Sequence, residues 1–480
     1  MRPLTVSELI EAHAVELSED PPYLDREGRS YEQDDLFNIC LGLIEIAYIE
    51  NENKVIVSVA RIAHFSIKEY LQSDRIRQQK AEKFAIDSGS ANAELSQICL
   101  VYLLDPILSD GDMDEAKRQA FPLTHFAAVH WFDHYQSSRA DPESERLLLR
   151  LFKNENNSFV IWARIYEIDR TWAPRYFCER YVDSVTSPIY YASYLGLENI
   201  LRAILDMYEE RRSLLDFINR PFGVHHNALQ AASHEGHKRI VQMLLDHGAK
   251  INVEGEAAGG ALYDASSNGH YQVVQILLKH GAKVNANRGD SGTALIPASA
   301  GGHNQVVQML LDHGADVNAS GSQYSNAMAA ASHYGRDQVV QILLDHGAYV
   351  NDPNAYGNPP LTEASEFGHE AIVRILLDHG ADVNASGSQL HYDFYATSDP
   401  DPYCKPIIKA SRNGHETIVR MLLDHGADVN DPNTYSNPLT EASRNGREAI
   451  VRILLDHGAD VNGPKKSGEP LIEASHYGRD

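Results

Sequence analysis

Residues 227–253, with the sequence NALQAASHEGHKRIVQMLLDHGAKINV, decide the fold because close copies of this stretch recur through the second half of the chain. The phrase LLDHGA or a near copy recurs at intervals of 33, 33, 33, 33, 46 and 32 residues, with its histidine at His247, His280, His313, His346, His379, His425 and His457. An Ala-Ser pair keeps step with it, beginning at Ala232, Ala265, Ala298, Ala331, Ala364, Ala410, Ala442 and Ala474. Two markers that share one period indicate one structural unit repeated along the chain.

Within one unit the pattern predicts a helix, a turn, a second helix and a loop. Small residues before Gly236 favour a short first helix that packs closely on its neighbours, and the glycine turns the chain. The second helix has an apolar stripe with the spacing of a buried face, formed by Ile240, Val241, Leu244 and Leu245. It is expected to end at Gly248, where only glycine adopts the left-handed conformation freely. The LLDHGA histidines are expected to cap helix ends, and the asparagines that follow them belong to polar loops.

This unit resembles the ankyrin repeat, which has the same length of 33 residues. The openings NALQAAS, TALIPAS, PPLTEAS and NPLTEAS depart from the family's usual T-P-L-H, so other interactions must hold these turns. A degenerate copy precedes them at 187–206. The resemblance implies a mainly α fold with an ankyrin-repeat solenoid over 187–480, made of about eight full repeats and a truncated ninth. A solenoid needs a polar terminal cap, and the ninth repeat stops after its first helix without one. We therefore expect that the sequence is a fragment or comes from a split gene.

The first part of the chain predicts a small mixed unit followed by helices. Thr5 and Glu8 form a capping box for a first helix, and 34–44 predict a second helix. Alternating valines at 55–59 predict a half-buried strand, and Ser66 with Glu69 begins a further helix. We therefore expect a winged-helix-like domain over 1–75. A helical linker domain over 76–186 follows, with helices over 92–106, around 125–135 and over 143–152.

The phrases RPLTVSELIEA, DLFNICLGLI, VSVARIAHFSIKEYLQSDRI and AELSQICLVYLL follow one another in this order. Together they resemble the winged-helix region that follows the NACHT nucleotide-binding domain in fungal NLR-like proteins, a region also described beside GPI inositol-deacylase-like sequences. The resemblance covers about residues 1–105, and AHFSIKEYL at 63–71 is its most specific part. In that family a winged helix and a helical linker join a nucleotide-driven switch to a sensor that is often made of ankyrin repeats.

This resemblance implies the sensor or regulatory arm of an NLR-like signalling receptor, with a NACHT domain upstream in cis or supplied in trans. The alternative is a free-standing ankyrin scaffold or adaptor protein. The sequence contains no G-x-x-x-x-G-K-[ST] loop to hold phosphates, so the chain alone is not expected to hydrolyse nucleotide.

Composition narrows the class of partner. The chain has 42 Lys and Arg against 67 Asp and Glu, a formal net charge of −25, which argues against nucleic-acid or anionic-membrane binding. The 4 cysteines form no CxxC pair, and no run of 18 or more apolar residues occurs. We therefore expect a cytoplasmic protein with protein partners.

No motif supports catalysis, a cofactor or a metal, so the chain is not expected to be an enzyme. HEGH at 234–237 differs from the zincin HExxH, because its histidines are three residues apart and a glycine lies between them. His64, Ser66 and Glu69 resemble a catalytic trio, but Ser66 is better explained as a helix cap. The G-x-S-x-G elbow of a deacylase is missing.

The 46-residue interval contains 46 − 33 = 13 extra residues, within 388–406. Its acidic residues lack the order of an EF-hand calcium loop; they are Asp393, Asp399 and Asp401. The insertion is either a protruding contact or a tolerated excursion, and the sequence leaves both open.

Recognition is the function that the repeats favour. The two residues after each Ala-Ser vary while the frame around them does not, and in ankyrin stacks these positions and the loop tips line the concave face. Tyr and Arg dominate binding hot spots, at about 2 kcal/mol or more each. The candidate partner-binding residues are His234, Glu235, Tyr324, His333, Tyr334, Tyr356, Glu366, Phe367, Arg412, Tyr435 and Arg444. The alternative is that these are neutral surface positions.

Overall fold

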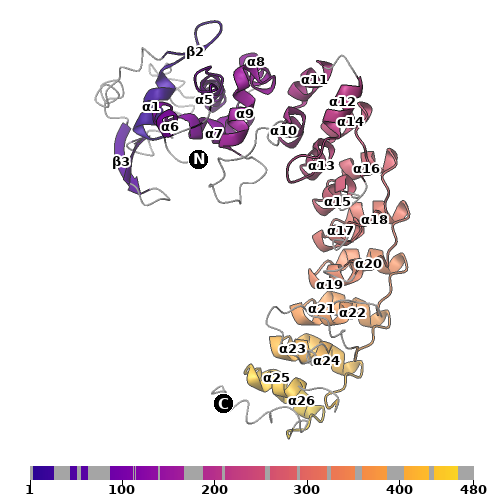
Figure 1. The fold of residues 1–480 in the computed structure, drawn as a ribbon. Helices are drawn as coiled ribbons and strands as arrows, with labels where there is room; N and C mark the ends of the chain where they lie inside the picture. Colours follow the sequence, from indigo (N-terminus) through magenta and orange to yellow (C-terminus); the bar gives the residue numbers. More distant parts are fainter. Residues whose placement is uncertain are drawn as a thin grey trace, which may run out of the picture. The chain divides into compact units, whose positions relative to one another are not determined.

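The computed structural model of the chain describes residues 4–25, 44–50, 56–62, 87–111, 113, 115–138, 141–166, 187–207, 211–253, 260–288, 292–321, 326–351, 359–385, 405–431 and 437–462. The chain divides into two compact units, 1–217 with 222–224 and 218–221 with 225–480 (Figure 1). Four predicted features lie outside the described residues: the helix over 34–44 except its last residue, the helix that begins at Ser66, the ninth repeat and most of the 388–406 insertion. The predicted domain boundaries stay predictions.

The first unit begins with the capping box that the sequence predicts. The Thr5 backbone N–H donates to Glu8 Oε2 at 2.7 Å, and the Glu8 N–H donates to Thr5 Oγ1 at 3.2 Å. These reciprocal bonds satisfy two N–H groups at the start of α1 (Val6–His13), which have no partner inside the helix.

The described strands form two antiparallel pairs: β1 (Val15–Glu16) with β2 (Tyr23–Leu24), and β3 (Ile44–Glu50) with β4 (Ile56–Ile62). The predicted strand is β4, which places Ala47 opposite Val59. The prediction of a helix as far as Ile44 was wrong, because Ile44 is the first residue of β3. The stretch IEIAYIE continues the apolar spacing of the preceding residues and also alternates, so its period does not separate helix from strand.

The α-helices described in the rest of this part of the chain are α5 (Ser88–Leu103), α6 (Glu115–Ala120), α7 (Thr124–Ser137), α8 (Pro142–Phe152), α9 (Ser158–Ile165), α10 (Pro188–Tyr194), α11 (Glu198–Asp206) and α12 (Arg211–Ile218). The three predicted linker helices correspond to α5, α7 and α8. Their core is aromatic, with Trp162 of α9 in edge contact with Trp131 of α7 at 5.5 Å and with Tyr191 of α10 at 5.4 Å between ring centroids. The Trp162 Nε1–H donates to the Ala128 carbonyl at 3.1 Å, which satisfies its polar atom.

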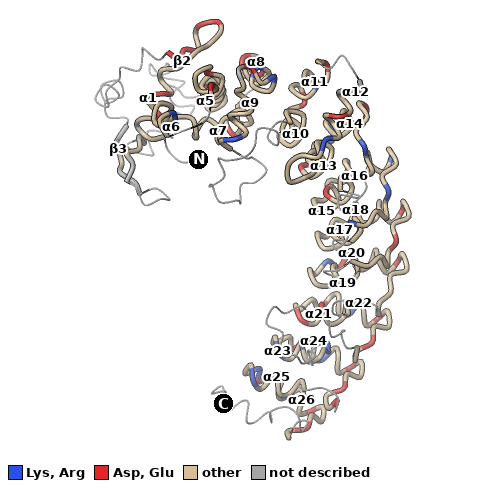
Figure 2. The backbone as a smooth tube through the Cα atoms, in the orientation of Figure 1, with Lys and Arg blue, Asp and Glu red and all other residues tan. Residues whose placement is uncertain are grey.

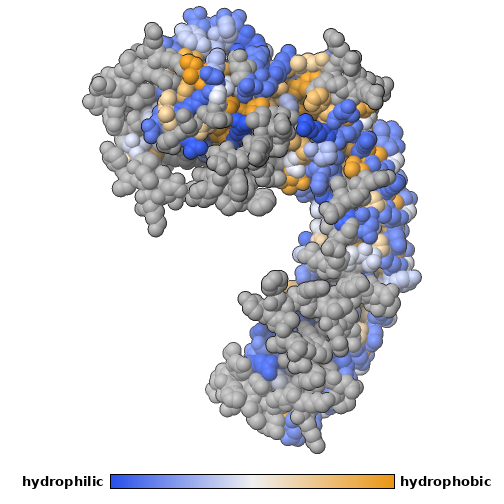
Figure 3. Space-filling model, viewed as in Figure 1, coloured by the Kyte–Doolittle hydropathy of each residue, from blue (hydrophilic) through white to orange (hydrophobic). Residues whose placement is uncertain are grey.

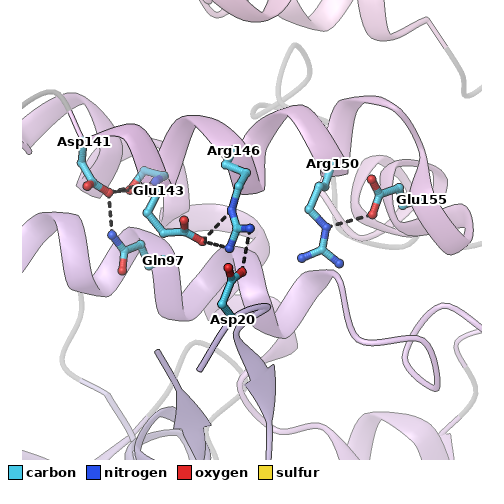
Figure 4. A network of polar contacts seen from close by, with 8 residues as sticks. Asp20, Gln97, Asp141, Glu143, Arg146, Arg150 and Glu155 are labelled. Carbon is cyan, nitrogen blue, oxygen red and sulfur yellow. Dashed lines mark hydrogen bonds and ion pairs between the residues drawn. The ribbon is translucent and has the colours of Figure 1, made fainter. Parts of the chain in front are cut away.

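A polar network along α8 connects it with other elements of this unit (Figure 4). Asp141, the residue before α8, accepts a hydrogen bond from Gln97 of α5 at 2.5 Å. Arg146 pairs with Glu143 on its own helix and with Asp20 from the β1–β2 turn, both at 2.8 Å. Because these ion pairs are exposed to water, which screens them, they contribute little to the stability of the fold.

The second unit is a stack of helix pairs: α13 (Ala228–His234) with α14 (Lys238–Asp246), α15 (Gly260–Ser267) with α16 (Tyr271–Lys279), α17 (Leu295–Gly301) with α18 (Asn304–Asp312), α19 (Ala327–His333) with α20 (Asp337–Asp345), α21 (Pro360–Phe367) with α22 (Glu370–Asp378), α23 (Pro406–Asn413) with α24 (Glu416–Asp424), and α25 (Pro438–Arg444) with α26 (Glu448–Asp456). The first helices of neighbouring pairs pack more closely than the second helices, since the Ala-Ser alanines between them are fully buried. The stack therefore curves with its first helices on the inner side (Figure 1). We call the exposed surface of these first helices and their C-terminal turns the inner face.

The recurrent asparagines join each repeat to the next. The Asn285 side chain accepts from the Asp316 N–H at 2.8 Å and donates to the Gly314 carbonyl at 2.9 Å. The same two bonds are made by Asn219, Asn252, Asn318, Asn351, Asn384 and Asn430. The LLDHGA histidines cap helix ends as predicted, each donating from Nδ1 to the carbonyl four residues earlier at 2.8 Å.

A second set of bonds between repeats comes from the residue before each second helix. His369 Nε2–H, for example, donates to the His333 carbonyl of the preceding repeat at 3.0 Å. The equivalent bonds are made by His270, His303, Arg336, His415 and Arg447. We call these six residues the entry residues. Each lies against the turn glycine of the preceding repeat, such as Gly335 under His369.

The turns without T-P-L-H are held by other groups, as expected. Asn227, Asn326 and Asn437 each precede a first helix and accept a hydrogen bond from the N–H three residues later, at 2.9, 2.8 and 2.7 Å. The helices α21, α23 and α25 begin with a proline, which has no N–H to satisfy and a backbone angle suited to the first turn.

Candidate functional site

The predicted partner-binding residues within the described ranges lie along the inner face. They stand at the C-terminal ends of α13, α19, α21, α23 and α25 or directly after them; they are His234, Glu235, His333, Tyr334, Glu366, Phe367, Arg412 and Arg444. Tyr324, Tyr356 and Tyr435 fall outside the described residues. In the view of Figure 3 the described surface of this unit is mostly hydrophilic, with single hydrophobic residues between.

Two neighbouring repeats place an aromatic cluster on this face, which we define as His333, Tyr334 and Phe367. The His333 ring contacts the Tyr334 ring at 4.6 Å and the Phe367 ring at 4.3 Å between centroids, both edge to face. Tyr334 is 41% exposed and Phe367 46%, although each makes a packed contact. His333 is held in place by Nδ1, which lies 2.7 Å from Glu363 Oε2. The cluster is therefore an oriented apolar surface that faces solvent.

Three polar side-chain pairs run diagonally between neighbouring repeats from α19 to α25 along the same face, and we call them the diagonal pairs. The residue after Ala-Ser in one repeat contacts the residue before Ala-Ser in the following repeat. The three pairs are His333 with Glu363 at 2.7 Å, Glu366 with Lys409 at 3.2 Å, and Arg412 with Glu441 at 2.8 Å. Three predicted partner-binding residues therefore also bind within the chain.

Sequence reasoning missed the residue before Ala-Ser, although a signal for it exists. This position varies as much as the one after Ala-Ser, reading Ala231, Asp264, Pro297, Ala330, Glu363, Lys409 and Glu441 along the repeats. The two positions are three residues apart on the first helix and so share one face.

The last two described repeats form an arginine cluster, which we define as Arg412, Arg444 and Arg447. Arg412 Nε and Arg444 Nη1 bind the two oxygens of Glu441 at 2.8 and 2.9 Å, and the Glu441 side chain is only 1% exposed. Arg447 Nε donates to the Arg412 carbonyl at 3.2 Å. Three arginines and one glutamate give 3 − 1 = +2 in a chain whose net charge is −25. Figure 2 shows this positive charge at α23 and α25, and negative charge along the loops at the opposite edge of the same repeats.

A different buried carboxylate lies near the other end of the inner face. Asp264 of α15 pairs with Arg288 at 2.8 Å, and the Arg288 guanidinium lies 5.1 Å from the centre of the Tyr263 ring. Burial raises the pKa of Asp264 above its ordinary value of 3.8, and the attraction of Arg288 offsets only part of that effect.

The raised pKa predicts how Asp264→Asn changes stability with pH. Well below pH 3.8 the wild-type side chain is protonated in both the folded and the unfolded chain, so folding buries no charge at this position. As the pH rises through the folded pKa, the wild type must keep a desolvated carboxylate and loses stability that the variant keeps. The Tm of the variant minus that of the wild type should therefore increase from pH 4 to pH 7.5, as followed by thermal unfolding. An equal difference at both pH values would contradict a raised pKa.

The remaining candidate chemistry has little support among the described residues. His234 ends α13 while His237 precedes α14, so HEGH does not lie on one helix face. Within the described ranges no group of three or more His, Cys, Asp or Glu could hold a metal ion, and no helix there has the length and apolar character to cross a membrane. Burial raises the pKa of the Cys99 thiol to about 12, which leaves it unreactive. His64, Ser66, Glu69, Asp393, Asp399 and Asp401 lie outside the described residues.

Comparison with known families confirms the expected fold class, a mainly α solenoid preceded by a winged helix. Residues 256–321, 295–386 and 389–465 match the family of ankyrin repeats, and 225–256 match the single ankyrin repeat. Residues 1–87 match the winged helix domain of GPI inositol-deacylase.

One curated relative and one solved structure illustrate the similarity. The chain is 54% identical over 253 residues to the "Azaphilone pigments biosynthesis cluster protein L" of Monascus ruber, covering 52% of this chain and 53% of that protein. The chain therefore spans about half the length of this relative. The human ASB11 ankyrin repeat domain is 25% identical, with a TM-score of 0.37, and the match covers 44% of this chain and 90% of that one.

Proposed function

We propose that this chain is a non-enzymatic recognition protein whose ankyrin repeats bind a protein partner on the inner face. The observation that carries the proposal is the aromatic cluster, where Tyr334 and Phe367 are exposed yet held by the ring of His333. Aromatic side chains fixed in this way lose little conformational freedom on binding, and Tyr is enriched among hot-spot residues. Ankyrin repeats are themselves typical of protein–protein interaction.

We further propose that the chain acts as the sensor or regulatory arm of a cytoplasmic NLR-like receptor. The match of 1–87 to a winged helix domain ahead of ankyrin repeats supports this role, because that is the order in which such receptors join switch to sensor. The nucleotide switch would come from a NACHT domain in cis or in trans.

A free-standing scaffold or adaptor is the second candidate function. It is favoured by the relative that shares half of the chain, because that protein is named for a biosynthesis cluster and not for a receptor. An immunoblot of native extract separates the two. A product well above 53.4 kDa, or recovery together with a NACHT protein, favours the receptor arm. A product of 53.4 kDa without such a protein favours the scaffold.

The recognition surface is tested with the full chain carrying Tyr334→Ala and Phe367→Ala as capture bait in native extract. Recovery of specific partners should fall about 30-fold, the equivalent of 2 kcal/mol at a hot spot. Tyr349→Ala is the matched control, since Tyr349 is 62% exposed after α20 and outside the aromatic cluster. Equal recovery by wild type and double variant would show that the inner face is not the binding surface. Measurable ATP turnover by the pure chain would contradict the non-enzymatic role.

A further inference from the structure

The aromatic cluster borders a carboxylate on the inner face. Glu363 lies four residues before Phe367 on α21, so the two side chains share one side of the helix. The His333 ring lies against both of them, because its Nδ1 is 2.7 Å from Glu363 Oε2 and its centroid is 4.3 Å from that of Phe367. An acidic group and an exposed aromatic ring therefore lie within reach of one side chain of a partner.

The Phe367 ring is accessible to a partner. It is 46% exposed, and its ring contacts within the described residues are those with His333 and His369. An aromatic ring packs against apolar groups and also attracts a cation that lies over its face. The charges beside the ring therefore decide which kind of group it suits.

The charge beside the ring is negative. Glu363 accepts one side-chain hydrogen bond within the described part of the chain, from His333, which leaves Oε1 for another donor. Glu366 pairs with Lys409, but its side chain is 25% exposed and that of Lys409 only 9%, so a partner meets the carboxylate more than the ammonium. With histidine counted as neutral, Glu363, Glu366 and Lys409 give 1 − 2 = −1, and Figure 2 shows the acidic residues at α21. This part of the inner face therefore favours a cation over an anion.

Arginine is the cation that this arrangement suits best. Its planar guanidinium stacks on an aromatic ring and at the same time donates hydrogen bonds from its edge to a carboxylate. A lysine ammonium is a compact charge and has no plane to stack on the ring. Because the arginine cluster follows on α23 and α25 and repels further cations, we expect the rest of a basic segment to run from α21 towards α13.

We propose that the inner face at α19 and α21 binds an arginine side chain of a protein partner, whose guanidinium stacks on Phe367 and donates to Glu363. The proposal rests on the proposed function and specifies the partner's chemistry. Charge complementarity supports it, because a chain with a net charge of −25 attracts basic partners and speeds their association.

Fluorescence polarisation of the full chain with labelled peptides tests the proposal. The probes GSRGSRGSRGS and GSKGSKGSKGS carry the same charge, so the general attraction to an acidic chain is equal for both. The arginine probe should bind about fivefold or more tightly than the lysine probe. The proposal would be overturned by equal or tighter binding of the lysine probe, by tighter binding of the acidic probe GSEGSEGSEGS, or by no binding of the arginine probe.

Variants locate the site. Glu363→Gln, which keeps the shape of the side chain, should weaken the arginine probe about tenfold, and Phe367→Ala should weaken it about fivefold. Glu370→Gln is the matched control, since it removes the same charge from an exposed residue of α22. If Glu363→Gln and Glu370→Gln have equal effects, the probe senses only the net charge and the inference fails. If the variant with Tyr334→Ala and Phe367→Ala loses its natural partners in native extract while Glu363→Gln keeps them, the proposed function stands without this inference.

Discussion

Replacing Arg412 and Arg444 together by alanine is expected to lower the free energy of unfolding by about 3–5 kcal/mol, the usual cost of removing one side of a buried ion pair. Both arginines bind the Glu441 carboxylate, whose side chain is 1% exposed. Either arginine alone still neutralises this charge. Each single replacement should therefore cost about 1 kcal/mol, and the double variant should cost more than the sum of the two.

The matched variant is Glu441→Gln, which keeps the shape and removes the charge. The two arginines are partly exposed and can be hydrated, so this change should cost only about 1 kcal/mol. Urea unfolding of the full chain followed by circular dichroism measures all four variants, and hydrogen exchange in α23 and α25 locates the loss. Two outcomes would contradict this prediction: single arginine effects that add up to the effect of the double variant, or a loss of stability in Glu441→Gln as large as that in the double variant.

Gly335→Ala is expected to cost about 3 kcal/mol, because it combines backbone strain with a collision. Gly335 has φ of 71°, a left-handed conformation that costs other residues about 1–2 kcal/mol. A Cβ at this position would lie 2.7 Å from Cε1 of the His369 ring. The ring must then move, and its hydrogen bond to the His333 carbonyl is lost.

Two further variants separate strain from collision. Gly347 has a similar φ of 83° but nothing within 4 Å of an added Cβ, so Gly347→Ala should cost only the strain, about 1–2 kcal/mol. In a His369→Ala background the extra cost of Gly335→Ala should disappear. Equal losses of Tm for Gly335→Ala and Gly347→Ala would show that the contact with His369 does not restrict this turn.

The repeat architecture could be predicted from the sequence because each repeat obeys local rules. Periodic apolar residues, glycine stops and the LLDHGA histidines act within one helix pair, so their spacing is enough to place α13 to α26. The residues that form contacts between repeats were harder to identify from the sequence. Asn285 has the composition of a loop residue, yet it bonds backbone groups of the next repeat, about 30 residues away. The pattern of neighbouring residues does not indicate a hydrogen-bond partner that lies so far away in the sequence.

In the candidate site, too, positions within one repeat could be predicted from the sequence, whereas contacts between repeats could not. The positions of Tyr334 and Phe367 followed from the repeat frame, which places every residue after Ala-Ser on one side of the stack. The bond between Arg412 and Glu441 did not follow, because its members are 29 residues apart and each has other charged residues closer in sequence. In the first unit β3 was missed because its alternation coincides with a helical spacing.

Two of the kinds of contact between repeats, the asparagine bonds and the diagonal pairs, have opposite consequences for evolution. The asparagine bonds are the same at each boundary from Asn219 to Asn430, so a duplicated repeat brings compatible connectors with it and can be inserted beside any other. The diagonal pairs differ at each boundary and make the order of repeats matter. Exchanging the repeats of α21 and α23 would bring Lys409 beside His333 and Glu366 beside Glu441, so two of three boundaries would lose their attraction. The number of repeats in such a chain is therefore free to change by recombination, while the sequence of charges along the inner face selects which rearrangements survive.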